Sequence, residues 1–145
     1  MSEEYLIRHY KTSDFTQIAN LWRATGLGNA ERGDNQKVIN ETLKRGGIFL
    51  VLELTEIKEI IGTSWVTNDG RRLYLHHFGI KPEYQGKELA KILMDATLDF
   101  ARHKKMQIKL EVHQDNFKAL NLYKTYGFNY LGDYQVYIIR DFGKE

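Results

Sequence analysis

The sequence has 145 residues and a mass of 17.0 kDa, which predicts one domain over residues 1–145 with a single hydrophobic core. Its 21 basic and 19 acidic residues leave a formal net charge of only +2. This balance argues against a general nucleic-acid-binding protein, because capture of a phosphate backbone needs a concentrated basic charge. The absence of cysteine excludes disulfides, cysteine-ligated metal sites and a covalent thiol intermediate.

Membrane insertion and secretion are not expected from the apolar pattern. No segment approaches the ~18 consecutive apolar residues that a bilayer-spanning helix needs. The first four residues, Met1-Ser2-Glu3-Glu4, are acidic, whereas a secretion signal begins with basic residues and continues with a long apolar stretch. We therefore expect a cytoplasmic protein that does not bind membranes.

The first half of the chain predicts strands and helices from its apolar spacing. Residues 6–10 suit a short strand, and apolar positions three and four residues apart after Asp14 predict a helix. A second helix is expected over 35–45, followed by the glycine pair Gly46-Gly47. Three antiparallel strands are then expected over 48–52, 60–66 and 73–80.

The second half predicts a long helix over 86–105, a strand over 108–112, a helix that Asp115 or Asn116 caps and Gly127 ends, and two strands over 129–132 and 135–141. The element order is β-α-α-β-β-β-α-β-α-β-β. It indicates an α/β or α+β fold with four helices and a mixed, mostly antiparallel sheet of about seven strands. One right-handed β-α-β crossover through the long helix is expected.

The start of the long helix has the features of an anion-binding site. Gly86 allows a ligand to approach the backbone, and Ala90 keeps the first turn narrow. Lys87 and Lys91 add positive charge beside a helix N-terminus, where amide groups without an intrahelical partner attract phosphate. By itself this arrangement is also typical of an ordinary helix boundary with solvated lysines.

Two segments together carry a resemblance to a known family. They read PEYQGKELAK over residues 82–91 and LEVHQDNFKALNLYKTYGF over residues 110–128. They resemble the GNAT superfamily of acetyltransferases, whose motifs are Gln/Arg-x-x-Gly-x-Gly/Ala and a later Asn-x-x-Ala-x-x-x-Tyr-x-x-x-Gly-Phe. The second motif matches at every fixed position. The first departs at Glu88, where the family has glycine, and this places a carboxylate beside the expected pyrophosphate site.

The resemblance implies a fold and a cosubstrate. The closest likeness is to the small branch that includes the ribosomal-protein N-terminal acetyltransferases. The sheet should open in a V between its fourth and fifth strands, with acetyl-CoA bound there. The residues implied to hold acetyl-CoA are Phe78, Gly79, Ile80, Gln85, Gly86, Lys87, Glu88, Leu89, Ala90, Lys91, Asn116, Ala119 and Tyr123. A backbone amide at a bulge near Gly79 can stabilise the thioester oxygen during attack.

The implied reaction is direct transfer of acetyl from acetyl-CoA to a primary amine in a ternary complex. Tyr123 is the expected acid, because a phenol can supply a proton to a departing thiolate. The base that accepts the amine proton is expected to be Glu111, then His77, then His76. Glu111 matches the position of the base in the ribosomal-protein branch, and other branches place it on the preceding central strand. Strand alternation predicts that His76 and His77 face opposite sides of the sheet.

The resemblance implies an acceptor amine on a small molecule or at the N-terminus of a peptide or protein. Glu31, Asp34 and Asp133 are candidates to meet a cationic amine, and Tyr130, Tyr134 and Tyr137 are candidates to line its groove. A CoA-binding sensor of the same fold without catalysis is the alternative function. No metal or nucleic-acid partner is expected, and the chain is expected to be a monomer or a homodimer.

Overall fold

A computed structural model describes residues 4–28 and 32–143. The chain forms two compact units, Met1–Glu111 and Val112–Glu145. The first unit contains a five-stranded sheet in the order β1-β2-β3-β4-β5. Its strands are β1 (Tyr5–His9), β2 (Ile48–Leu54), β3 (Glu59–Asn68), β4 (Arg72–Ile80) and β5 (Gln107–Leu110). Neighbouring strands are antiparallel except for β4 and β5, which are parallel.

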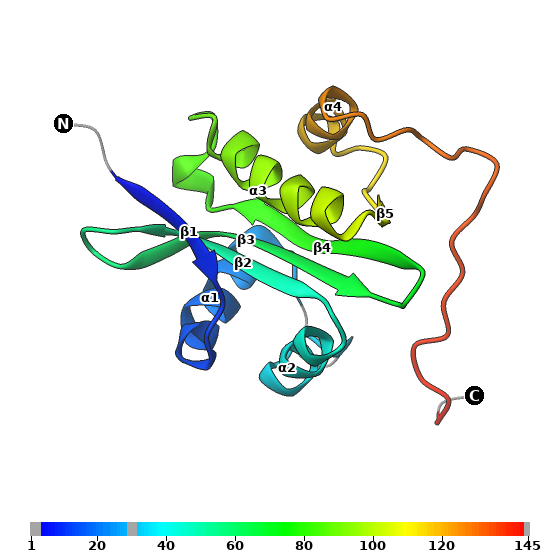
Figure 1. Cartoon of the computed structure of the whole chain (residues 1–145), viewed down its shortest axis with the longest axis horizontal. Helices are drawn as coiled ribbons and strands as arrows, with labels where there is room; N and C mark the ends of the chain where they lie inside the picture. The colour runs from blue at the N-terminus through cyan, green and yellow to red at the C-terminus, as the bar shows by residue number, and fades with distance from the viewer. Residues whose placement is uncertain (1–3, 29–31, 144–145) are drawn as a thin grey trace. The chain divides into compact units, whose positions relative to one another are not determined.

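The helices of the first unit cover both faces of this sheet. Figure 1 shows α1 (Phe15–Thr25) and α2 (Gln36–Lys44) on one face and α3 (Leu89–Lys104) on the other. Short 3₁₀ helices, Thr12–Asp14 and Pro82–Tyr84, precede α1 and α3. The second unit contains α4 (Phe117–Thr125). The expected mixed α/β class and its four α-helices are therefore present in the described residues.

Two buried clusters lie on opposite faces of the sheet. The cluster beneath α1 and α2 is aromatic and contains Trp22, Phe49 and Trp65. The cluster beneath α3 is aliphatic and contains residues such as Leu52, Leu89 and Leu93. Burial of these side chains is the main free-energy term that holds the helices on the sheet.

The boundaries of two elements differ from the sequence-based expectation. Helix α3 begins at Leu89 instead of Gly86, because Gly86 and Glu88 have φ angles of 79° and 66° that an α-helix cannot contain. Strand β5 ends at Leu110, so Glu111 follows the strand and does not lie within it. The β4–β5 register also ends there, at Leu75 and Leu110, although β4 continues to Ile80.

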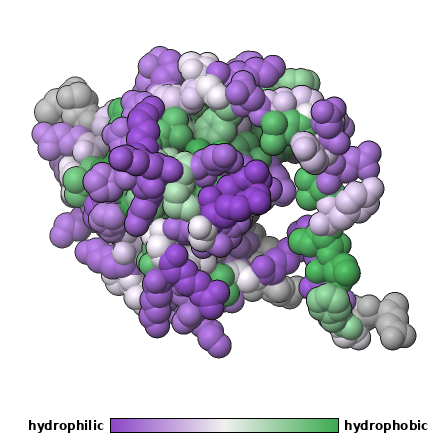
Figure 2. Space-filling model, turned by 45° about the vertical axis from the view of Figure 1, so that its right-hand side comes forward, coloured by the Kyte–Doolittle hydropathy of each residue, from purple (hydrophilic) through white to green (hydrophobic). Residues whose placement is uncertain are grey.

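The prediction of two C-terminal strands was wrong. Residues 129–143 contain no strand, so the described chain has five strands and not seven. Figure 2 shows hydrophobic side chains gathered on this segment, and Val136, Ile138 and Ile139 are all exposed. Alternating apolar residues specify which face a strand would bury, but a strand forms only where another strand supplies hydrogen-bond partners. Among the described residues, no helix combines the length and apolar character needed to cross a membrane.

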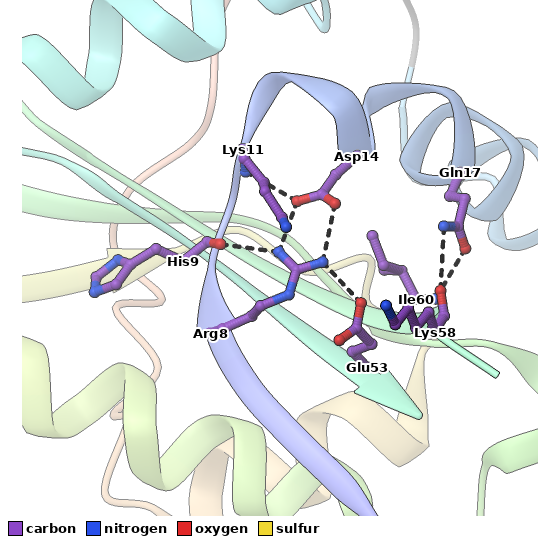
Figure 3. Close-up of polar contacts among 8 residues, drawn as sticks. All are labelled: Arg8, His9, Lys11, Asp14, Gln17, Glu53, Lys58 and Ile60. Atoms are coloured by element: carbon purple, nitrogen blue, oxygen red, sulfur yellow. Dashed lines mark hydrogen bonds and ion pairs between the residues drawn. The ribbon is translucent and has the colours of Figure 1, made fainter. Parts of the chain in front are cut away.

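A charged network connects β1 to the start of α1 and to β2 (Figure 3). The Arg8 guanidinium donates to both carboxylate oxygens of Asp14 at 2.9 Å and to Glu53 at 2.8 Å. The backbone amide of Lys11 also donates to Asp14, at 2.9 Å. Burial opposes ionisation of Asp14, but the hydrogen bonds from Arg8 and Lys11 prevail and lower the pKa of this carboxyl.

This network predicts that the free energy of unfolding decreases in acid. A carboxyl whose pKa is lower in the folded state stabilises the fold above its unfolded pKa of about 3.9, and the contribution is lost as the pH falls further. We expect Asp14→Asn to lower the free energy of unfolding at pH 7 by about 1.5–3 kcal/mol and to flatten its dependence on pH below about 4. Urea unfolding from pH 7 to pH 3 measures both effects. The exposed Asp95→Asn change is the control, and equal pH slopes for the two variants would contradict the prediction.

Candidate functional site

Strand β4 contains a bulge at the centre of the candidate site. Thr63 pairs with Gly79 and Trp65 pairs with His76, so β4 has one more residue than β3 between these two pairs. His77 lies within the extra length and has a φ of 46°, in the left-handed region that costs a non-glycine residue about 1–3 kcal/mol. The structure therefore has a bulge near Gly79, where the resemblance implied one.

The bulge brings His76 and His77 to the same face of the sheet, so the prediction from alternation was wrong. Both imidazole rings lie against Trp65, with centroid distances of 5.7 Å and 5.6 Å. Trp65 belongs to the aromatic cluster beneath α1 and α2. The physical reason is that a bulge sets two residues of one strand opposite a single residue of its neighbour, which interrupts the period of two.

The three candidate bases belong to one group of contacting side chains in the first unit. The ring of Tyr74 stacks on His76 with centroids 4.2 Å apart and planes within 6°. Burial and a hydrogen bond with Glu111 raise the pKa of the Tyr74 hydroxyl. The rings of His76 and His77 are 6.2 Å apart. The fold thus brings Glu111, His76 and His77 together on one side of β4, with Tyr74 between Glu111 and His76.

The two histidines differ in their partners. Nε2 of His76 shares a hydrogen bond with the Thr67 hydroxyl at 2.9 Å, and burial together with the neighbouring His77 lowers the pKa of His76 to about 4. Nε2 of His77 instead lies 2.8 Å from an oxygen of Asp34. His76 is therefore a weak base at neutral pH, whereas the His77 ring is in direct contact with a carboxylate.

The turn before α3 has the shape of an anion cradle. Gly86 has a φ of 79°, and a Cβ added there would meet nothing within 4 Å. The amides of Leu89, Ala90 and Lys91 form the first turn of α3, where no earlier carbonyl of the helix can accept their hydrogen bonds. Such amides attract a phosphate group, and the open space at Gly86 allows one to approach the backbone. The residues present therefore fit a pyrophosphate.

The side chains around this turn make different contacts. The amide nitrogen of Gln85 donates to the carbonyl of Ile80 at 2.9 Å, which ties the turn to the end of β4. The Leu89 side chain is buried in the aliphatic cluster, so only its backbone can meet a ligand. Lys87 lies over the ring of Tyr84, and Lys91 forms an exposed ion pair with Glu88 at 3.3 Å.

In the first unit, Glu88 has the backbone conformation of the glycine that the motif has at this position. Its φ of 66° and ψ of 8° are left-handed, which L side chains adopt at a cost of about 1–2 kcal/mol. The carboxylate remains exposed and pairs with Lys91. Glu88 therefore adds a negative charge at the site where the resemblance implies a phosphate.

The second unit contains the remaining candidate residues on or beside α4. Asn116 is the N-cap, and its side-chain oxygen accepts from the amide of Ala119 at 3.3 Å. Burial raises the pKa of Tyr123 to about 12, and its ring lies edge-on to Phe128 at 5.7 Å. The amide of Phe128 donates to the carbonyl of Tyr123 at 3.0 Å beyond Gly127, whose φ is 91°. The Gly-Phe end of the motif therefore closes the helix.

The candidate acceptor residues have different positions. Asp34 pairs with His77, whereas Glu31 lies outside the described residues. Asp133 and the tyrosines at 130, 134 and 137 are exposed in the second unit. Sequence reasoning missed Tyr74 and Thr63. The sequence gives a weak indication of Tyr74, because this residue stands two positions before His76 on the same strand. It gives none of Thr63, since only the strand register shows that Thr63 lies opposite Gly79.

Known proteins share both the sequence pattern and the fold. A model of the Acetyltransferase (GNAT) family matches residues 15–128. An acetyltransferase from Streptococcus agalactiae has a TM-score of 0.80 at 22% identity, with 94% of this chain and 92% of that chain covered. Glucosamine-6-phosphate N-acetyltransferase from Arabidopsis thaliana has a TM-score of 0.73 at 16% identity, with 97% and 99% covered.

A further structure of this fold contains acetyl-CoA. It is a predicted acetyltransferase with acetyl-CoA from Clostridium acetobutylicum, with a TM-score of 0.73 at 17% identity and with 93% of this chain and 96% of that chain covered. At these identities the likeness shows a common fold. The family model, in contrast, spans most of the present sequence, including the turn before α3 and the Asn116–Phe128 motif. The protein therefore belongs to the GNAT family of acetyltransferases.

Proposed function

We propose that the protein is an N-acetyltransferase that uses acetyl-CoA as a substrate and acetylates a primary amine by direct attack in a ternary complex. The observation that carries this proposal is the β4 bulge, with candidate bases gathered beside it. The cysteine-free sequence supports direct attack, because it offers no thiol to carry the acetyl group covalently.

The reaction requires a protonated amine to lose two protons, the first to solvent before it attacks and the second as the amide forms, and it requires one proton to reach sulfur. A lysine-like amine is mostly protonated at neutral pH, since its reference pKa is about 10.4. His77 or Glu111 is the proposed base. As the new C–N bond forms and the C–S bond breaks, the base accepts the amine proton, and the proton donated by Tyr123 completes the thiol of CoA. Negative charge on the thioester oxygen is stabilised by a backbone amide at the bulge.

The proposed acid is Tyr123, on the basis of its place in the Asn116–Phe128 motif. Its raised pKa of about 12 keeps the phenol protonated throughout the physiological range. Transfer of its proton to a free thiolate, with a reference pKa near 8.5, is uphill. Its first contribution is therefore a hydrogen bond to the sulfur as negative charge develops. The proton follows as the C–S bond breaks, and the tyrosinate then regains a proton from solvent.

The pyrophosphate of acetyl-CoA is proposed to bind at the start of α3. The backbone amides at Gly86 and from Leu89 to Lys91 would donate to it, and Lys87 and Lys91 would add positive charge. The backbone from Phe78 to Ile80 is proposed to hold the pantetheine arm, together with Asn116. The Asn116 oxygen already caps α4, so its amide nitrogen is the group that would donate to this arm.

The test of this function combines binding and turnover. Calorimetric titration with acetyl-CoA measures binding. Thiol release is then followed across polyamines, amino acids, aminoglycosides and N-terminal peptides. Because the chain has no cysteine, a thiol reagent reports only the CoA that is released. We expect binding, and release with one class of amine. Binding without release for any amine would favour the sensor alternative, and no binding would overturn the proposal.

Variants of Glu88 test the cofactor site separately. Glu88→Gln removes the charge and keeps the left-handed backbone, whereas Glu88→Gly also removes the backbone strain. A charge at a helix N-terminus contributes about 0.3–1 kcal/mol, so we expect Glu88→Gln to lower the Kd for acetyl-CoA about 2–5-fold and Glu88→Gly to lower it at least as much. The exposed Glu56→Gln change is the control. An unchanged Kd in both Glu88 variants would contradict this role of the carboxylate.

A further inference from the structure

His77 is held by contacts to its ring and to its backbone. Its Nε2 lies 2.8 Å from Oδ1 of Asp34, and the two side chains are only 18% and 15% exposed. The ring packs edge-on against Trp22 at 4.8 Å and lies 5.6 Å from Trp65. A pair this far from solvent is screened less than a surface ion pair, so the carboxylate is well placed to fix the orientation of the imidazole.

A buried relay fixes the backbone of the same residue. The indole nitrogen of Trp22 donates to the Thr63 hydroxyl at 3.0 Å, and this hydroxyl donates to the carbonyl of His77 at 2.7 Å. Trp22 and Thr63 are 2% and 0% exposed. The left-handed backbone of His77 therefore persists because buried hydrogen bonds on α1 and β3 hold its carbonyl. Strain that the surrounding structure maintains in this way is concentrated at functional sites.

His77 differs from the other candidate bases in the charged and polar groups that surround it. Asp34, from the segment before α2, and Glu111, after β5, both act electrostatically on the neighbouring His76, as does His77 itself. Tyr74 stacks on His76 and bonds to Glu111. The residues that α1 and β3 present to His77 are the uncharged Trp22, Thr63 and Trp65. Asp34 is therefore the carboxylate in direct contact with the His77 ring.

We propose that Asp34 is a positioning residue that makes His77 the base for the amine, an inference that rests on the proposed acetyl transfer. The carboxylate accepts the Nε2 hydrogen of His77, which leaves the lone pair on Nδ1. Nδ1 accepts the proton from the amine as the C–N bond forms, and Asp34 stabilises the resulting imidazolium. Asp34 itself stays ionised and contacts no reacting atom.

The test compares Asp34→Asn, Asp34→Glu and the exposed control Asp95→Asn. An amide keeps the size of the side chain but loses its charge, and it can donate to Nε2 and so select the other imidazole tautomer. We expect Asp34→Asn to lower kcat/KM at least 10-fold and to move the ascending limb of its pH profile to lower pH, with an unchanged KM for acetyl-CoA. Asp34→Glu should recover part of the loss, and Asp95→Asn should match the wild type.

A second measurement does not depend on turnover. Nitrogen-15 NMR of the histidine rings, assigned with His77→Gln, reports the tautomer and the titration midpoint of His77. We expect the Nε2–H tautomer in the wild type, and in Asp34→Asn a midpoint at lower pH. Unchanged NMR titration in Asp34→Asn would overturn the pairing. A changed titration with an unaltered pH profile of kcat/KM would overturn the catalytic use of His77 and favour Glu111.

A different result is expected if the protein does not catalyse the proposed acetyl transfer. In that case the wild type releases no CoA with any amine. Such a result would overturn the role of Asp34 in catalysis, while the NMR titration would still show whether it holds His77. A thermal melt of each variant confirms that the protein remains folded.

Discussion

Replacing Tyr123 with phenylalanine is expected to lower kcat for acetyl transfer about 100-fold or more, because a positioned acid contributes about 10²–10⁴-fold to a rate. The change removes one hydroxyl and keeps the ring, whose edge-on contact with Phe128 remains possible. The Kd for acetyl-CoA should therefore stay close to that of the wild type. Steady-state thiol release and calorimetry on the same preparation separate the two effects.

The matched control for this prediction is Tyr5→Phe. Tyr5 lies in β1, is 40% exposed and has no proposed role in the site, so the same chemical change there should leave kcat unaltered. Retention of wild-type kcat in Tyr123→Phe would remove the phenol from the mechanism. A large rise in the Kd for acetyl-CoA with an unchanged kcat would assign Tyr123 to binding alone.

The largest expected effect on stability is that of Phe49→Ala. Phe49 lies in β2, is 1% exposed and contacts the rings of Tyr10, Trp22 and Trp65 at 5.0, 6.0 and 5.8 Å. Truncation of such a ring leaves a cavity and costs about 3–5 kcal/mol, a large share of the roughly 5–15 kcal/mol that stabilises a typical domain. Urea unfolding measures the loss.

This prediction has its own control and a consequence for the site. Phe142 is 88% exposed, so Phe142→Ala should change the free energy of unfolding by less than about 0.5 kcal/mol. Trp22 and Trp65, which contact Phe49, also contact His77. At a temperature where Phe49→Ala remains folded, we therefore expect its kcat/KM to fall as well. Equal unfolding energies for the two alanine variants would contradict the assignment of Phe49 to the core.

Glu88 shows that the backbone conformation of a family motif can be present without the residue that the motif has there. The motif has glycine at this position, and in this chain Glu88 adopts a φ of 66° that favours glycine. The buried Leu89 directly after it anchors the first turn of α3 in the aliphatic cluster. Packing of α3 thus holds the turn in the glycine conformation although glycine is absent.

The sequence by itself determined the local elements and the family. Apolar spacing of three and four residues predicts α1 and α3, because that period places a helix's buried side chains on one face. The antiparallel β2–β3 and β3–β4 pairs follow from short connections between neighbouring strands. The Asn116 cap and the Gly127 end of α4 were also predictable, since a cap depends on only a few adjacent residues.

The tertiary structure decided the features that depend on register and on distant partners. The extra residue in β4 places His76 and His77 on the same face, because the pairing with Thr63 and Trp65 is set by the whole sheet. Asp34 meets His77 across 43 positions of sequence, which no local pattern encodes. Residues 135–141 are rich in the β-branched and aromatic residues typical of strands, yet residues 129–143 form none. Side-chain periodicity is a local property, whereas hydrogen-bond partners and buried charge pairs come from segments far apart in the chain.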